Sequence, residues 1–373
     1  MTVHRFAFPT AIHFGPGARK LVAENLIAAG CKRPLIVTDG GLAALPVFQE
    51  FKKNLQGLDS GVFSGVQGNP VASQVRAGAD AFRAHSADAV IGFGGGAALD
   101  VAKAVALMAV HPGDVLEYAW DHANVRPIEK PLPLFVALPT TAGTGSEVGR
   151  SSVISDDETH IKRIIFSPAL LAKAVFADPE LTLALPPKLT AATGMDALTH
   201  NIESYLSPAY HPLCDGIALE GVRIAARALP LAVKEPQNIQ ARSDMLMASM
   251  MGAIAFQKDL GAVHSCAHAL STVADLHHGL ANALMIDHVM RFNLSAAEAK
   301  MKELARVAGA TDLISFLVQL KREIGIPDRL AVVGIRQDQF PRLVEIAVAD
   351  ICHQTNPRPC TKRDFEQLFA AAL

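Results

Sequence analysis

The sequence predicts two domains, an α/β domain with a parallel sheet followed by an all-helical domain. In the first half, short β-branched runs alternate with helical stretches, which is typical of a parallel sheet covered by helices. After residue 185 strand signals nearly disappear, and long segments rich in Ala, Leu and Met follow with helical period. The 373 residues suffice for two domains of roughly 100–200 residues each. We therefore predict domains at residues 1–185 and 186–373.

The α/β domain is predicted from four strand-like runs and the helical segments between them. The runs PLIVT, AVIGF, LFVAL and AVFA occupy residues 34–38, 89–93, 134–138 and 174–177. Amphipathic segments at residues 18–29 and 74–85 have the spacing of helices. A linker at residues 185–188, with two adjacent prolines that interrupt regular structure, ends this domain.

The helical domain is predicted from apolar periodicity alone. Its expected helices cover residues 190–206, 215–232, 241–255, 262–274 and 296–308. Because ligands commonly sit where two domains meet, we expect a cleft at that place.

Composition excludes several classes of partner. Lys and Arg total 34 against 36 Asp and Glu, which leaves no basic surface for nucleic acid or for a membrane. The first residues lack the pattern of a secretory signal, and the longest apolar stretch is too short to span a bilayer. The five cysteines are an odd number without a CxxC pair, so we expect free thiols and a cytoplasmic protein.

A glycine-rich turn at residues 92–96 follows a predicted strand directly and opens a helix. Glycines there let the backbone approach a diphosphate, whose charge the helix N-terminus favours. Ala97 breaks the G-x-G-x-x-G pattern, so an ordinary tight turn explains this motif equally well.

Two further strand ends carry polar groups. Asp39 ends the first predicted strand, where a carboxylate can bind the ribose hydroxyls of NAD and repel the extra phosphate of NADP. Taken alone, Asp39 is more simply a turn residue before two glycines. Residues 139–147 (PTTAGTGSE) follow another strand, and three such loops at successive strand ends favour a ligand at that edge of the sheet.

Histidines and one carboxylate recur at helical spacing in the second domain. Asp196 and His200 are four residues apart, His264 and His268 repeat that spacing, and His277-His278-Gly279 follows at an expected turn. Fe²⁺ or Zn²⁺ suits imidazole plus one carboxylate. A single such pair is more often an ordinary pair of side chains, but five candidates in an apolar domain favour a metal.

Glu203 lies one helical turn beyond His200. It can orient a metal ligand from outside or simply face solvent.

These motifs together resemble the iron-activated, type III alcohol dehydrogenases along essentially the whole chain. The likeness rests on GGG-x3-D-x2-K (residues 94–103), PTTAGTGSE (139–147), GMDALTH (194–200) and H-x3-H-x9-HG (264–279). It implies metal ligation by Asp196, His200, His264 and His278, usually of Fe²⁺ with Zn²⁺ as the alternative. It also implies that His268 binds no metal, lies near the nicotinamide and relays a proton.

The resemblance further implies the residues that contact NAD and the substrate. The expected cofactor contacts are Asp39, Gly95, Gly96, Asp100, Thr140, Thr141, Thr144 and Lys162. Phe256 and Cys352 match positions that line the substrate pocket. Two departures are Ala97, where the family has Ser, and His277, where it commonly has Pro, so His277 competes with His278 as the last ligand.

Local features look like the subgroup that contains 4-hydroxybutyrate dehydrogenases. Arg150 stands where many members have a neutral residue, and it could hold a substrate carboxylate by a two-pronged hydrogen bond. Ser151 and Lys258 are added to this tentative substrate set. A solvated arginine at a loop edge is an equal alternative.

The sequence thus predicts a metal-dependent enzyme that transfers a hydride between NAD and a small alcohol, hydroxyacid or semialdehyde. The leading substrate pair is 4-hydroxybutyrate and succinic semialdehyde, with short-chain alcohols or diols as the alternative. A lyase resembling 3-dehydroquinate synthase and a non-catalytic metal- and nucleotide-binding protein are the less favoured hypotheses. The resemblance also suggests a homodimer or a larger homo-oligomer.

Overall fold

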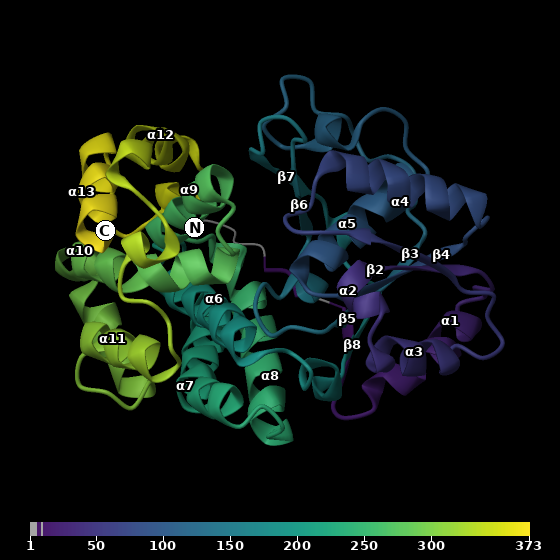
Figure 1. Cartoon of the computed structure of the whole chain (residues 1–373), viewed down its shortest axis with the longest axis horizontal. Coiled ribbons are helices and arrows are strands. Elements are labelled where there is room, and N and C mark those ends of the chain that lie inside the picture. Colours follow the sequence, from purple (N-terminus) through teal and green to yellow (C-terminus); the bar gives the residue numbers. More distant parts are fainter. Residues whose placement is uncertain (1–5, 9) are drawn as a thin grey trace. The chain divides into compact units, whose positions relative to one another are not determined.

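The computed structural model describes residues 6–8 and 10–373 and divides them into two units (Figure 1). The sheet unit comprises residues 8–141 and 146–182, and the helical unit comprises residues 183–373, residues 142–145 and residues 6–7. The chain therefore enters the helical unit at residue 183, close to the expected boundary after 185. Four residues of the PTTAGTGSE loop also belong to the helical unit, which periodicity alone does not indicate.

Six parallel strands form the centre of the sheet unit in the order β1-β8-β5-β4-β2-β3. They are β1 Ala11–Phe14, β2 Pro34–Asp39, β3 Gly61–Val66, β4 Ala89–Gly94, β5 Leu134–Pro139 and β8 Ala174–Ala177. The predicted α/β class is confirmed. The four predicted strands are the interior strands β2, β4, β5 and β8, whose buried positions are filled by residues such as Ile36, Ile91 and Val136.

The edge strands β1 and β3 escaped prediction for a physical reason. Strand β3 (GVFSGV) holds two glycines and is partly exposed, so it lacks the continuous apolar run of a buried parallel strand. The small antiparallel hairpin of β6 (Ser151–Ser155) and β7 (Lys162–Phe166) was not predicted either, because its strands mix polar with apolar residues and are too short for a clear pattern.

The carboxyl ends of three interior strands lie at one edge of the sheet. Val37 pairs with Gly92 and Gly94 pairs with Pro139, so the loops after β2, β4 and β5 leave the sheet side by side. This is the edge at which the sequence places a ligand. The helices of this unit are α1 Val22–Ala28, α2 Gly40–Ala43, α3 Pro46–Lys53, α4 Ala72–Ala84 and α5 Gly96–Met108.

The helical unit contains the remaining named helices and a large apolar core of its own. They are α6 Pro187–Leu206, α7 Pro212–Lys234, α8 Ile239–Ala255, α9 Ala262–Ala274, α10 His278–Val307, α11 Leu313–Glu323, α12 Phe340–Ala349 and α13 Lys362–Ala372. The predicted turn at His277-His278-Gly279 is corrected, because α10 begins at His278 and His277 is its N-cap. The expected helix at 296–308 is the last part of this longer helix.

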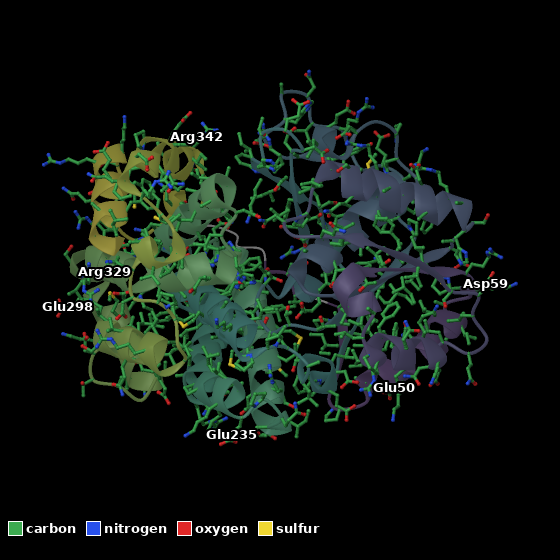
Figure 2. All side chains as sticks on the ribbon, in the orientation of Figure 1. Glu50, Asp59, Glu235, Glu298, Arg329 and Arg342 are labelled. Atoms are coloured by element: carbon green, nitrogen blue, oxygen red, sulfur yellow. The ribbon has the colours of Figure 1, made fainter. Side chains whose placement is uncertain are left out.

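Charged side chains such as Glu235, Glu298 and Arg329 are exposed on the helical unit (Figure 2). None of the helices in the described part of the chain combines the length and apolarity needed to cross a membrane. All five cysteines are free thiols.

Candidate metal centre and cofactor loop

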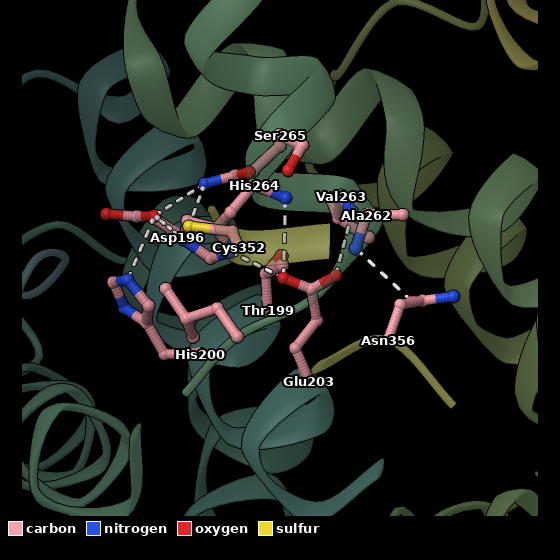
Figure 3. A network of polar contacts seen from close by, with 12 residues as sticks. Asp196, Thr199, His200, Glu203, Ala262, Val263, His264, Ser265, Cys352 and Asn356 are labelled. Carbon is pink, nitrogen blue, oxygen red and sulfur yellow. Dashed lines mark hydrogen bonds and ion pairs between the residues drawn. The ribbon is translucent and has the colours of Figure 1, made fainter. Parts of the chain in front are cut away.

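Four candidate ligands converge on one point inside the helical unit. Helix α6 carries Asp196 and His200, α9 carries His264, and α10 begins with His278 (Figure 3 shows the first three). From Asp196 Oδ1, the Nε2 atoms of His200, His264 and His278 lie at 3.8, 3.7 and 3.5 Å. The ligand atoms of Asp196, His200 and His264 all lie within 4.8 Å of one another. Donors about 2.1 Å from a tetrahedral ion are about 3.4 Å apart, so these three can share one ion, and His278 beside Asp196 is the candidate fourth ligand.

Burial and charge in this cage also fit a divalent cation. Asp196, His200 and His264 are each at most 4% exposed. Burial alone would raise the pKa of Asp196, but His200, His278 and His264 hold it well below its usual value. Burial also disfavours charge on His264, yet hydrogen bonds to Asp196 and Glu203 raise its pKa to about 9. The cage therefore attracts positive charge, and a metal would displace the proton from His264.

The His278 side chain, not that of His277, is the one that reaches Asp196. Gly279 makes this approach feasible. A Cβ at residue 279 would lie 2.2 Å from the carbonyl oxygen of Ala192 on α6, closer than real atoms approach. The absence of a side chain therefore lets the start of α10 lie against α6, and the distances favour His278 as the fourth ligand.

Glu203 is buried behind the cage and does not face solvent. Its Oε2 accepts a hydrogen bond from His264 Nδ1 at 2.6 Å, which leaves Nε2 of that ring as the atom facing the cage. Its Oε1 accepts the backbone N–H of Val263 at 2.7 Å in the first turn of α9, where the N-cap Gly261 offers no side chain. Glu203 thus both caps α9 and orients the candidate ligand that α9 carries.

Asn282 is a buried neighbour of the cage that sequence reasoning missed. Its Nδ2 donates to Asp196 Oδ1 at 2.7 Å and lies 3.4 and 3.3 Å from the Nε2 atoms of His264 and His278. Its Oδ1 has no hydrogen-bond partner among the described residues. The position one turn after His278 on α10 is the only sequence signal that could have pointed to it.

His268 lies beside the cage and has a partner that the sequence did not reveal. Its ring stacks on that of His278 at a centroid distance of 5.3 Å. Its Nδ1 is 2.7 Å from Oδ2 of Asp350, the residue after α12. The two predicted pocket residues are nearby. The Sγ atom of Cys352 and the ligand atoms of His268 and Asp350 lie within 4.8 Å of one another. The ring centroid of Phe256 is 5.3 Å from that of His200.

In the sheet unit, the glycine turn after β4 has the close contacts expected of a phosphate loop. Gly94 has a φ of +154°, and a Cβ there would lie 2.7 Å from that of Ala98. A Cβ at Gly95 would lie 3.2 Å from the Thr141 side chain, so the two predicted cofactor residues face each other. Helix α5 starts at Gly96 without a side-chain cap, which leaves its first N–H groups to other acceptors.

Asp39 caps a short helix beside the glycine turn, and its contact with the ribose remains a prediction. Oδ1 accepts the N–H of Leu42 at 2.7 Å and so caps α2, as a turn residue would. Oδ2 lies 3.9 Å from the Cβ position at Gly94, beside the glycine turn. Thr140 joins the same edge, because its N–H donates to the carbonyl of Gly94 at 3.0 Å.

Asp100 holds the cofactor loop from behind. Its Oδ1 accepts from Ser146 Oγ and its Oδ2 from the N–H of Val153 at 3.0 Å, so both oxygens have partners within the protein. Lys103 Nζ donates to the same Ser146 hydroxyl at 2.8 Å. The structure thus shows Asp100 bracing this loop, and its expected contact with NAD remains a prediction. Thr144 lies in the part of the loop that joins the helical unit, and Lys162 begins β7.

The tentative substrate residues separate into two groups. Lys258 is buried, forms an ion pair with Asp215 and donates to the Tyr205 carbonyl, and its expected contact with the substrate remains a prediction. Arg150 lies over the ring of Phe166 at 6.0 Å and makes no ion pair within the described residues. The carbonyl of Ser151 accepts a hydrogen bond from Lys103, and its side chain stays partly exposed.

Comparison with known proteins agrees with this geometry. Residues 9–179 match the family described as iron-containing alcohol dehydrogenase, and residues 190–373 match the C-terminal part of the Fe-containing alcohol dehydrogenase family. A 4-hydroxybutyrate dehydrogenase from Cupriavidus necator is 37% identical over 377 residues, which cover 98% of each chain. This chain is therefore an oxidoreductase that belongs to the iron-containing alcohol dehydrogenase family, as the motifs predicted.

Solved structures support the same assignment. A 1,3-propanediol oxidoreductase is 36% identical with a TM-score of 0.95, over 100% of both chains. A sulfoacetaldehyde reductase from Bifidobacterium kashiwanohense, solved in complex with NAD⁺, is 30% identical with a TM-score of 0.90, over 100% of this chain and 99% of the other.

Proposed function

We propose that the protein transfers a hydride reversibly between NAD and the alcohol carbon of a small substrate, with Fe²⁺ as its metal and Zn²⁺ as the alternative. The observation that carries this proposal is the cage itself. One carboxylate and two imidazoles from α6 and α9 have ligand atoms within 4.8 Å of one another, and His278 at the start of α10 reaches the same carboxylate. A cluster of this kind is costly to bury without a cation.

The side chains of the cage would each have a defined task. Asp196, His200, His264 and His278 would hold the metal, which when bound polarises the alcohol oxygen as a Lewis acid. Glu203 keeps the Nε2 atom of His264 turned inward. Phe256, beside His200, supplies an apolar wall that suits the carbon chain of a small alcohol.

The cofactor is proposed to bind at the strand ends of the sheet unit. The glycine turn and the first N–H groups of α5 would hold the diphosphate, and Asp39 would accept from the adenosine ribose. Thr140 and Thr141 lie at the same edge, while Thr144 and Lys162 remain predicted contacts. The solved relative with bound NAD⁺ supports this choice of cofactor.

For the substrate we propose 4-hydroxybutyrate and its semialdehyde. The Cupriavidus necator relative supports a hydroxyacid. In this chain the guanidinium of Arg150 lies on an exposed aromatic ring and has no carboxylate partner in the described residues, so it can receive an anion. A diol or a neutral short-chain alcohol is the second candidate, because a 1,3-propanediol oxidoreductase is about as similar.

The test of the class is anaerobic loading with Fe²⁺ after complete chelation, followed by NADH formation with hydroxyacids, diols and simple alcohols. We expect activity to be lost with the metal and restored by Fe²⁺, with NAD preferred over NADP. Net NADH formation also excludes a lyase, which returns its cofactor oxidised. Full activity without metal would overturn the proposal.

The substrate proposal has a separate test in Arg150→Ala. We expect KM to rise for 4-hydroxybutyrate and to stay unchanged for 1,3-propanediol, because only the hydroxyacid has a carboxylate for the arginine. Arg83→Ala, an exposed arginine on α4, is the matched control. Equal changes in KM for both substrates would show that Arg150 is no carboxylate clamp.

A further inference from the structure

The side chain of Asp350 is arranged to control the histidine beside the metal cage. We propose that Asp350 is a positioning residue that fixes the tautomer and orientation of His268, so that Nδ1 carries the hydrogen and Nε2 is left to accept the substrate proton. This inference rests on the proposed function, because it assigns a task to the proton-relay histidine of that same site.

The hydrogen bond between the two side chains is short and partly buried. His268 Nδ1 lies 2.7 Å from Asp350 Oδ2, and the two side chains are 16% and 14% exposed. Helix α9 carries the histidine, while Asp350 follows the last residue of α12, so two separate elements meet in this contact. Both can therefore be held by the packing of their own helices.

The other oxygen of Asp350 is held just as firmly. Oδ1 accepts from Ser265 Oγ at 2.7 Å and from the N–H of Cys352 at 2.9 Å. The N–H of His353 in turn donates to Ser265 Oγ at 2.9 Å, so the hydroxyl hydrogen of Ser265 is left to point at the carboxylate. Two donors thus hold Oδ1, and Oδ2 remains to face the imidazole.

An ionised carboxylate can only accept hydrogen bonds, and this decides the tautomer of the ring. Burial alone would raise the pKa of Asp350, but His268, Ser265 and the Cys352 N–H hold it well below its usual value. The imidazole nitrogen opposite Oδ2 must then carry a hydrogen. When His268 is neutral, the lone pair is therefore on Nε2.

The ring of His268 is held beside the metal ligands as well. It stacks on His278 with an interplanar angle of 20° and packs edge-on against His264 at 6.1 Å. During alcohol oxidation the C–H electron pair goes to the nicotinamide, and the hydroxyl proton goes to Nε2 of His268 and then to solvent. Atoms and charge balance as alcohol plus NAD⁺ giving aldehyde, NADH and a proton.

The decisive variant is Asp350→Asn. Its amide NH₂ can donate to Nδ1, which favours the opposite tautomer with hydrogen on Nε2. We expect kcat for alcohol oxidation to fall about 100-fold or more, the usual contribution of a positioned acid–base group. KM and the dissociation constants for NAD and Zn²⁺ should stay within about threefold, since none of these depends on the tautomer.

Two measurements separate positioning from a purely structural role. The ¹⁵N shifts of His268 in the Zn²⁺-loaded protein report the tautomer directly, and we expect them to exchange between Nδ1 and Nε2 in Asp350→Asn. Asp350→Asn combined with His268→Ala should also be no slower than His268→Ala alone, because Asp350 acts through that ring. Ser265→Ala, which leaves the His268 bond in place, should lower kcat by less than about tenfold.

Unchanged ¹⁵N shifts in Asp350→Asn, or a double variant markedly slower than His268→Ala, would overturn the inference. If Asp350→Asn unfolds at a much lower temperature, the wild-type ¹⁵N shifts still decide, because hydrogen on Nε2 contradicts the proposed tautomer. Failure of the proposed function would be distinguishable, since the wild-type protein would then lack NAD-linked activity while its His268 tautomer remained measurable.

Discussion

The most informative single substitution is Glu203→Gln, which changes one buried oxygen to nitrogen and leaves the side-chain shape intact. Glu203 accepts from the N–H of Val263 through Oε1 and from His264 Nδ1 through Oε2. A glutamine can supply only one of these two acceptors. If its oxygen stays on Val263, its NH₂ faces a ring nitrogen that also carries a hydrogen.

In Glu203→Gln, His264 either keeps its tautomer and faces a second donor or switches to the other tautomer, and both results weaken metal binding. Two donors facing each other lose a charge-assisted hydrogen bond worth about 1.5–3 kcal/mol. A switch of tautomer restores that bond but puts hydrogen on Nε2, the atom that faces Asp196. Since Glu203 and His264 are at most 2% exposed, water cannot compensate. We expect metal affinity to fall by 10–100-fold, as is typical when a partner of a ligand is removed.

The assay is competition for Zn²⁺ with a chromophoric chelator, together with the thermal unfolding midpoint of the metal-free protein. We expect a midpoint lower by a few degrees, because the first turn of α9 loses part of its cap. Glu220→Gln is the matched control, since Glu220 is 44% exposed and pairs only with arginine at the surface. A Zn²⁺ affinity of Glu203→Gln within twofold of wild type would refute the reasoning.

Three further predictions address other parts of the molecule. Asn282→Ala should weaken Zn²⁺ binding about tenfold, because Asp196 loses its neutral donor; unchanged competition would contradict this. Asp39→Ser should reduce the preference for NAD over NADP in kcat/KM, and an unchanged ratio would remove Asp39 from the ribose site. Burial raises the pKa of Glu147 from 4.5 to about 7. The buried neutral carboxyl therefore contributes about 3 kcal/mol to the stability of the folded protein below pH 4.5, and this contribution is lost as the pH rises through 7. Glu147→Gln should therefore raise the thermal midpoint more at pH 8 than at pH 5, and equal shifts would contradict it.

The sequence predicted what is local and periodic. The interior strands could be predicted because they are buried on both faces and so have continuous apolar runs. The candidate metal site could be predicted because the i, i+4 spacing puts Asp196 and His200 on one side of α6. The edge strand β3 carries no such signal, since three of its six residues are exposed and two are glycines.

Long-range partners could not be predicted in this way. Asp350 lies 82 residues from His268 in the sequence, at the end of α12, and the packing of α12 on α9 brings the two together. Glu203 had two equal interpretations because helical spacing says which side of α6 it occupies but not what covers that side. The assignment of residues 142–145 of the PTTAGTGSE loop to the helical unit likewise depends on long-range contacts. One of them is the hydrogen bond that the Ser249 hydroxyl donates to the Gly143 carbonyl.

Gly279 shows how a residue without any functional group can govern the chemistry of this protein. Even one added methyl would collide with the main chain of Ala192, and relieving that collision would displace the beginning of α10. His278 is the very next residue, so its imidazole would move with the backbone and away from Asp196. A mutational survey that looks only for lost donors would overlook this position, although the space available there admits nothing larger than hydrogen without a shift of the backbone.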